Sequence, residues 1–203
     1  MDIYGFDIET DTTINGLDPR VSKVVSMALY SPNYSIVIDG GTEVERLARL
    51  AEVAANLPRG SLIATWNGSV FDFPFLATRA LITGVRLGIE MQADPGITPK
   101  YEFTPPHTSG YRVRFAGHPH ADIAYAYQEY AATVGVTWSL KPVCAALGIE
   151  MVKVDASKIH ELSSEELAVY NMSDVRGTHQ AAELLGTSLD LYVDEIEHVT
   201  LVA

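Results

Sequence analysis

Acidic residues stand at three widely separated points of the sequence, each at the end of an expected secondary-structure element. Asp7 and Glu9 end a segment rich in β-branched and aromatic residues, and residues two apart on a strand point to the same face. Two carboxylates placed in this way can flank one ion. Asp72 follows another expected strand and stands among apolar neighbours, so its carboxylate needs a partner.

The third point lies on a long expected helix. Ser163 and Glu166 form a capping-box pattern that predicts where this helix begins. Tyr170 and Asp174 are four residues apart and therefore share one face of the helix. The pattern predicts a phenol beside a carboxylate.

Four carboxylates brought together would repel each other and bind protons more tightly, at a cost of several kcal/mol in a low dielectric. Divalent cations remove that conflict, and all-oxygen ligands suit Mg²⁺ or Mn²⁺ rather than zinc. Mg²⁺ sites combine a few carboxylates with water and substrate phosphate oxygens, which favours phosphate-ester chemistry. Taken singly, the three segments also fit a solvated strand end, a helix cap and a half-buried helix face, but their joint occurrence favours a metal site.

Hydrophobic patterning predicts the elements that must position these residues. Strands are expected over residues 2–8, 24–31, 34–39, 61–67, 111–116 and 121–123, and helices over 42–57, 71–83, 125–134, 139–147, 164–186 and 188–200. Gly84 is the expected exit from the second helix. Residues 86–119 contain five prolines and are expected to form an irregular insertion around one strand. This order predicts an α/β fold, with a mixed sheet of five strands or slightly more and helices on both faces.

Composition sets the protein class. A chain of 203 residues, 47% hydrophobic and 20% charged, matches one folded domain over 1–203 and argues against disorder. The single cysteine, Cys144, excludes an internal disulfide and a thiolate zinc cluster within one chain. No apolar run approaches the roughly 20 residues that cross a bilayer, and the first ten residues lack the positive charge of a signal peptide. We therefore expect a cytoplasmic protein without a membrane partner.

The charge balance is acidic but uneven. The net charge of −12 argues against a protein that tracks phosphates with Lys and Arg alone. Residues 86–141, however, carry five basic and five acidic groups, whereas 142–203 carry three and eleven. We expect an anionic substrate to approach near this balanced middle segment, or at acids whose sign is reversed by bound metal ions.

Three sequence segments resemble the exonuclease motifs of the DEDD superfamily, in the variant with Tyr in the third motif. They are FDIET at 6–10, NGSVFDFPFL at 67–76 and YNMSD at 170–174. Their residues are most similar to those of the 3′-5′ proofreading domain of family B DNA polymerases. HADIAYA at 120–126 and WSLKPVCAALGI at 138–149 also resemble segments of that domain. The resemblance spans residue 3 to about 186 and covers 86–119 and the C-terminus poorly.

The resemblance implies a ribonuclease H-like fold and a stand-alone 3′-5′ exonuclease. Such an enzyme hydrolyses phosphodiester bonds at the 3′ end of single-stranded nucleic acid, DNA being favoured, and releases nucleoside monophosphates. Asp7, Glu9, Asp72 and Asp174 would then hold two Mg²⁺ or Mn²⁺ ions, with Asp7 bridging both. Tyr170 would orient the attacking water, because a phenol with a pKa of about 10 is a poor general base at neutral pH.

Four further residues receive weaker roles. Thr10 and Asn67 match positions that touch the terminal nucleotide in the family. Lys141, at an expected helix start, is either a phosphate contact or an ordinary surface lysine. Asp122 matches an acid on a core strand of the relatives, and we expect it to be structural.

Two other functions remain open at this point. One is an RNA-trimming exonuclease similar to ribonuclease D, which also uses Tyr. The other is a non-catalytic module of the same fold that binds nucleic acid or a replication partner. The acidic surface predicts weak, salt-sensitive substrate binding, so a replication or repair partner would have to supply processivity.

Overall fold

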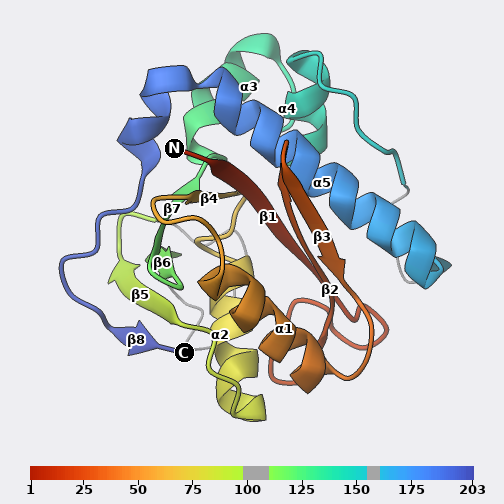
Figure 1. Cartoon of the computed structure of the whole chain (residues 1–203). Coiled ribbons are helices and arrows are strands. Elements are labelled where there is room, and N and C mark those ends of the chain that lie inside the picture. Colours follow the sequence, from red (N-terminus) through yellow and green to blue (C-terminus); the bar gives the residue numbers. More distant parts are fainter. Residues whose placement is uncertain (98–109, 155–160) are drawn as a thin grey trace.

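The computed structural model describes residues 1–97, 110–154 and 161–203. Within these residues the chain forms one eight-stranded mixed sheet, in the order β3-β2-β1-β4-β7-β6-β5-β8 (Figure 1). The strands are β1 (Ile3–Thr10), β2 (Val24–Ser31), β3 (Tyr34–Ile38), β4 (Leu62–Thr65), β5 (Ile89–Asp94), β6 (Gly110–Phe115), β7 (His118–Asp122) and β8 (Leu201–Val202). The predicted mixed sheet is confirmed, and it has more strands than five.

The centre of the sheet is parallel and its margins are antiparallel. β1 pairs in parallel with β4, and β4 pairs in parallel with β7. On one side β2 and β3 continue the sheet as antiparallel strands, and on the other side β6, β5 and β8 do the same. The β1–β4 pairing covers only Ile3 to Gly5, so the second half of β1 has no strand on that side.

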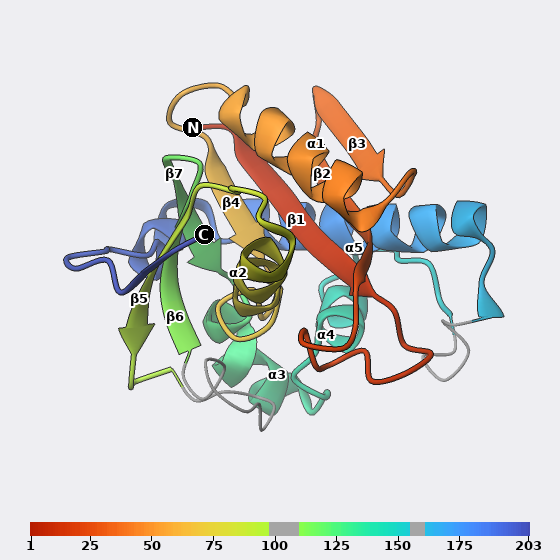
Figure 2. The same ribbon diagram turned by 90° about the horizontal axis from the view of Figure 1, so that it is seen from below.

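Helices cover both faces of the sheet, as predicted. Figure 1 shows α1 and α2 on one side of β1 and β2, and α5 with α3 and α4 on the other, and Figure 2 gives the view from below. The helices are α1 (Glu43–Ala55), α2 (Asp72–Thr83), α3 (Gln128–Val134), α4 (Leu140–Ala146) and α5 (Ser164–Leu184), with 3₁₀ turns at Tyr125–Tyr127 and Gly186–Tyr192. Each face has its own buried apolar cluster.

The sequence of β1 explains how the two faces differ. Tyr4, Phe6 and Ile8 alternate along the strand and are buried in the cluster under α1 and α2. Gly5 points to the other face, where an added Cβ would lie 2.1 Å from the backbone oxygen of Val175 in α5. Only a residue without a side chain fits this close approach. The helix therefore lies directly against the strand, and Asp174 comes next to Asp7.

The helix ends follow the local sequence signals. Ser163 accepts a hydrogen bond from the N3 amide of Glu166, and the Glu166 side chain accepts one from the Ser163 amide, so the predicted capping box is confirmed. Thr42 and Glu45 form a second capping box at the start of α1. Gly84 ends α2 in the left-handed conformation, with φ 76°, as predicted.

Two expectations are corrected. Residues 89–94 of the proposed irregular insertion form β5, which pairs with β6 along its whole length, while residues 98–109 lie outside the described part of the chain. The expected helix over 188–200 is wrong, because a 3₁₀ turn is followed there by extended chain and β8. Leu201 and Val202 pair with Met91 and Glu90 of β5. Non-local pairing with β5 satisfies this backbone, and local periodicity carries no sign of it.

Among the described residues, no helix combines the length and the apolar character that crossing a membrane requires.

Candidate metal centre

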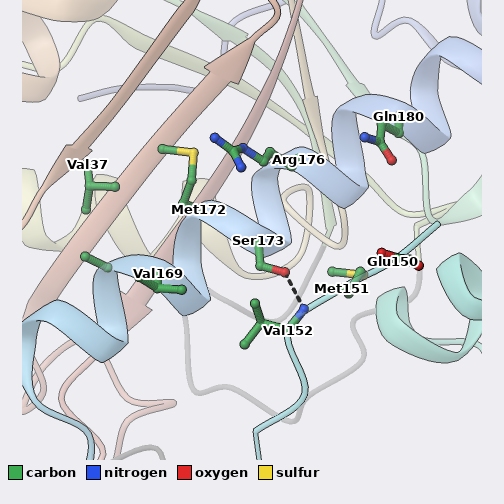
Figure 3. A pocket seen from close by; sticks show the side chains of 10 residues that line it. Val37, Glu150, Met151, Val152, Val169, Met172, Ser173, Arg176 and Gln180 are labelled. Carbon is green, nitrogen blue, oxygen red and sulfur yellow. Dashed lines mark hydrogen bonds between the residues drawn. The ribbon is translucent and has the colours of Figure 1, made fainter.

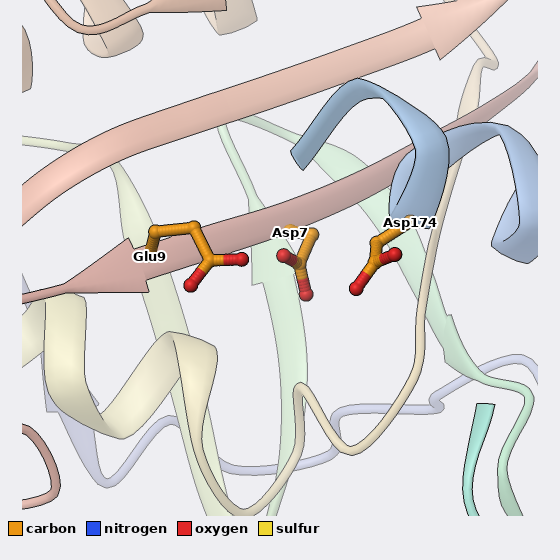
Figure 4. A group of neighbouring side chains, drawn as sticks. All are labelled: Asp7, Glu9 and Asp174. Carbon is orange, nitrogen blue, oxygen red and sulfur yellow. The ribbon is translucent and has the colours of Figure 1, made fainter. Parts of the chain in front are cut away.

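Carboxylates from β1 and α5 converge at the end of β1. Asp7 and Glu9 share the face of β1 that α5 covers, and Asp174 reaches them from α5 (Figure 4). One carboxylate oxygen from each of the three lies within 4.8 Å of the others. The structure therefore brings the first and third predicted segments together, through the contact that Gly5 permits.

Asp72 lies beside this group and is oriented by the backbone. It occupies the first turn of α2, and its Oδ1 accepts a hydrogen bond of 3.1 Å from the amide of Ile8. That amide is available because β4 no longer pairs with this part of β1. Asp72 is not one of the three acids within 4.8 Å, but it is close enough to Asp7 to raise the pKa of that carboxyl.

The electrostatics of the four acids are unfavourable without a cation. Burial raises the pKa of Asp7 well above its usual value, and Asp72, Glu9 and Asp174 raise it further. Burial, followed by the charge of Asp174, raises the pKa of Glu9 to about 8. Burial and the charge of Asp122 raise the pKa of Asp72 to about 8. Each carboxylate is thus favoured in its protonated form until positive charge arrives.

Lys141 supplies part of that charge. Its Nζ donates a hydrogen bond of 3.0 Å to Asp174 Oδ2 and lies 3.6 Å from the centroid of the Tyr170 ring. The ammonium lowers the pKa of Asp174, against the larger effect of burial that raises it. One ammonium cannot neutralise four carboxylates.

Tyr170 stands on α5 one turn before Asp174 and is 8% exposed. Burial raises the pKa of its phenol, and the charges of Asp174, Glu9 and Asp7 raise it further. The phenol is therefore neutral at ordinary pH.

The donor set fits hard divalent cations. It consists of carboxylate oxygens, which Mg²⁺ and Mn²⁺ prefer. Asp174 Oδ1 is buried and has no hydrogen-bond partner among the described residues. A buried carboxylate oxygen normally has a partner, and a metal ion is a suitable one here.

The two expected nucleotide contacts, Thr10 and Asn67, follow Glu9 and precede Asp72 in the sequence, respectively, and each makes a hydrogen bond within the protein. The Thr10 hydroxyl donates to the carbonyl of Gly16 at 2.6 Å, which ties the following loop to the end of β1. Asn67 has a φ of 68° and is half-buried in the turn before Asp72. Asp122 accepts hydrogen bonds from the amides of Asn67, Ser69 and Ala124, and this bonding is structural, as the sequence suggested.

A separate groove of about 730 Å³ lies along α5, on the side of the helix that carries Ser173 (Figure 3). Ser173 lines it and accepts a hydrogen bond of 2.8 Å from the amide of Val152. Ser173 and Asp174 are consecutive but face different sides of the helix, so this groove is distinct from the carboxylate cluster.

Gly5 lets α5 approach β1, and the sequence motifs did not predict this role. A glycine inside a strand whose other residues are β-branched, aromatic or acidic often marks a close approach of another backbone, and this signal was present in the sequence. The approach sets the distance between Asp7 and Asp174.

Comparison with protein families assigns the chain to a group. The model of the RNase H superfamily matches residues 4–163, a range that contains β4, β7, all of β1 but Ile3, and the acids at 7, 9 and 72. The chain belongs to the RNase H superfamily. Its mixed α/β sheet is the ribonuclease H-like fold, as expected from the sequence.

Membership of the RNase H superfamily makes this a nuclease-type hydrolase that acts on nucleic acid. Nucleases of this superfamily usually depend on divalent metals, and the cluster of Asp7, Glu9 and Asp174 is suited to hold them.

Proposed function

We propose that this member of the RNase H superfamily is a stand-alone, metal-dependent 3′-5′ exonuclease. Its substrate is the 3′ end of single-stranded nucleic acid, with DNA preferred, and it releases nucleoside monophosphates. The observation that carries the proposal is the convergence of Asp7, Glu9 and Asp174 within 4.8 Å, with Tyr170 one helical turn from Asp174. The order of the three sequence motifs supports the exonuclease assignment within the superfamily.

The four acids would hold two Mg²⁺ or Mn²⁺ ions. Asp7 has Glu9 on one side and Asp174 on the other, so its carboxylate would be within reach of both ions (Figure 4). Asp72 completes the set from α2, with the Ile8 amide fixing the orientation of its carboxylate. When bound, such ions lower the pKa of water and neutralise charge on the reacting phosphate and the leaving 3′ oxygen.

Tyr170 and Lys141 act on the water and the phosphate. The neutral phenol of Tyr170 hydrogen-bonds the attacking water and holds it in line with the scissile bond. Lys141 is bonded to Asp174 in this structure, and its flexible stem lets the ammonium move to a phosphate oxygen when substrate arrives. Thr10 and Asn67 lie at the two chain segments that lead into the site and are assigned to the terminal nucleotide.

Degradation of labelled oligonucleotides tests the function. A single-stranded DNA labelled at its 5′ end should shorten stepwise from the 3′ end in Mg²⁺ or Mn²⁺, with mononucleotides as the other product. Asp7→Asn is the control, because it keeps the size of the side chain and removes the charge. Equal degradation by both proteins, or internal cuts without mononucleotides, would overturn the proposal.

A matched RNA oligonucleotide distinguishes the DNA exonuclease from the RNA-trimming exonuclease. Faster removal of 3′ nucleotides from RNA than from DNA would replace the DNA assignment by RNA trimming. Saturable Mn²⁺ binding without hydrolysis of either polymer would favour the non-catalytic module.

A further inference from the structure

A series of hydrogen bonds between a half-buried aspartate and two fully buried side chains connects the C-terminal segment to the turn before Asp72. Asp194 Oδ2 lies 2.6 Å from His120 Nδ1, and His120 Nε2 lies 2.7 Å from Thr65 Oγ1. Thr65 Oγ1 in turn accepts a hydrogen bond of 3.1 Å from the amide of Gly68. Thr65 and His120 are both 0% exposed, so neither can meet a substrate.

The groups at the two ends of this series, the Asp194 carboxylate and the Gly68 amide, indicate which group donates in each hydrogen bond. The Asp194 carboxylate is an acceptor, and it also accepts a hydrogen bond of 2.8 Å from the amide of Val113. In the neutral imidazole the proton of His120 therefore lies on Nδ1, and Nε2 accepts from the Thr65 hydroxyl. The Thr65 oxygen remains free to accept from Gly68. Each group in the chain has a partner, and reversing one bond would break the next.

This series of hydrogen bonds ends at the turn between β4 and α2. Asp122 holds the amides of Asn67 and Ser69, so Thr65 and Asp122 together bind three consecutive backbone amides. A Cβ at Gly68 would lie 2.2 Å from Thr65 Oγ1, which shows how closely the hydroxyl fits the turn. The Gly68 carbonyl accepts from the amide of Phe73, the residue after Asp72.

His120 also contacts the start of α2 through its ring. The Phe73 ring packs edge-on against the imidazole, with centroids 4.8 Å apart and an interplanar angle of 76°. Asp72 thus stands between two contacts of the same histidine, one through Thr65 and Gly68 and one through Phe73. The backbone on both sides of Asp72 is thereby held in place, and the Ile8 amide bonds its carboxylate.

We propose that Thr65, His120 and Asp194 are positioning residues that fix the Asp72 carboxylate for metal binding. This inference rests on the proposed function for its catalytic consequence, but the positioning itself can be measured without catalysis. It also gives the extended segment around Asp194 a role in the site, although that segment lies outside the three motifs and beyond the residues that the family model matches.

The first test is the tautomer of His120. In the metal-free protein, long-range ¹H–¹⁵N spectra should show the His120 proton on Nδ1, with its signals assigned by their loss in His120→Gln. Asp194→Ala should shift the population to the Nε2–H form, whereas the exposed Asp190→Ala should leave it unchanged. An Nε2–H tautomer in the wild-type protein would overturn the proposal.

The second test separates positioning from stability. Thr65→Val should weaken Mn²⁺ binding, measured by calorimetry, and lower kcat/KM by about tenfold each, the usual size for loss of an outer partner of a metal ligand. Thr65→Ser restores the hydroxyl and should recover both. Thr83→Val is the matched control, because Thr83 donates to the Arg79 carbonyl at the far end of α2.

Unchanged Mn²⁺ affinity in folded Thr65→Val would contradict positioning, as would an equal loss in Thr83→Val. If Thr65→Val does not fold, Asp194→Ala and Asp190→Ala replace the pair in the same titration. If the wild-type protein binds Mn²⁺ but hydrolyses no oligonucleotide, the proposed function fails and the titration still judges the positioning chain.

Discussion

The protein buries acidic side chains in two places, and only one of them contains enough positive charge to neutralise the acid. Glu43 in α1 forms a bidentate pair with Arg79 of α2, and the Glu43 carboxylate also accepts from the amide of Val24. Arg79 adds a hydrogen bond of 2.9 Å to the carbonyl of Pro19. Both side chains are almost fully buried, and the charges cancel within the fold.

The metal centre lacks that cancellation. Among the described residues, Lys141 is the cation that acts on Asp7, Glu9 and Asp174, and burial raises the pKa of these acids and of Asp72. An acid neutralised by its own chain holds elements together. Acids that are short of positive charge cost stability until a ligand supplies it, which is the signature of a functional cluster.

Removing the central acid should have the largest effect on activity. Asp7→Asn should lower the single-turnover rate of DNA hydrolysis at least about 10³-fold, because the ligand shared by both ions is lost. In a chelator its melting temperature should equal or exceed that of the wild-type protein, since Asn is neutral like the protonated carboxyl that burial favours at Asp7. Activity within tenfold of the wild-type rate would contradict the assignment of Asp7.

Breaking the neutralised pair should have the largest effect on stability. Arg79→Met leaves Glu43 charged and buried, which costs about 3–5 kcal/mol and lowers the melting temperature by roughly 6–20 °C. Adding Glu43→Leu should recover most of this loss, because the unpaired charge is removed. Equal melting of the single and double variants would show that the pair is not neutralised as described.

Metal should stabilise the protein more at high pH. The folded-state pKa of Glu9 and Asp72 is about 8, above their ordinary values of 4.5 and 3.8, so the folded chain binds more protons between these limits. Metal-free stability should therefore fall as pH rises from about 4.5 to 8. Mg²⁺ at 100 times its Kd adds about 2.7 kcal/mol, or roughly 5–11 °C.

The measurement is a pair of thermal melts in chelator and in Mg²⁺. The rise in melting temperature should be largest at pH 8 and should shrink at pH 6, where protons compete with metal. Asp7→Asn should show little rise at either pH. A wild-type rise that is independent of pH would contradict the raised pKa values.

The smallest effect is expected at Lys141. Lys141→Met should lower kcat/KM by about tenfold through the lost phosphate contact, which corresponds to about 1.4 kcal/mol. Its Mn²⁺ affinity should be equal or higher, because the ammonium no longer competes for Asp174. Lys153→Met, at an exposed position, is the control for the loss of one charge. A parallel loss of Mn²⁺ affinity would make Lys141 a structural partner of the cluster.

Local signals in the sequence were sufficient for the elements that carry the acids. Alternation in β1, the capping box at Ser163 and the exit at Gly84 each rest on neighbouring residues, and each is confirmed. The face shared by Asp7 and Glu9 follows from the same period of two.

Features that depend on distant residues escaped prediction. β8 pairs with β5 across more than 100 residues of chain, and two strand residues give too little pattern to detect. The bond from Ile8 to Asp72 exists because β4 ends early, and the bond from Asp194 to His120 needs the C-terminal segment in place. None of these contacts leaves a trace in local periodicity.

The most direct test of the metal centre is anomalous diffraction from crystals soaked in Mn²⁺. We predict anomalous peaks within about 2.2 Å of carboxylate oxygens of Asp7, Glu9 and Asp174, a normal metal–oxygen distance. Lys141 Nζ should then lie farther than 3.0 Å from Asp174 Oδ2. Crystals saturated with Mn²⁺ that show no peak between these three acids, with Lys141 still bonded to Asp174, would contradict the account.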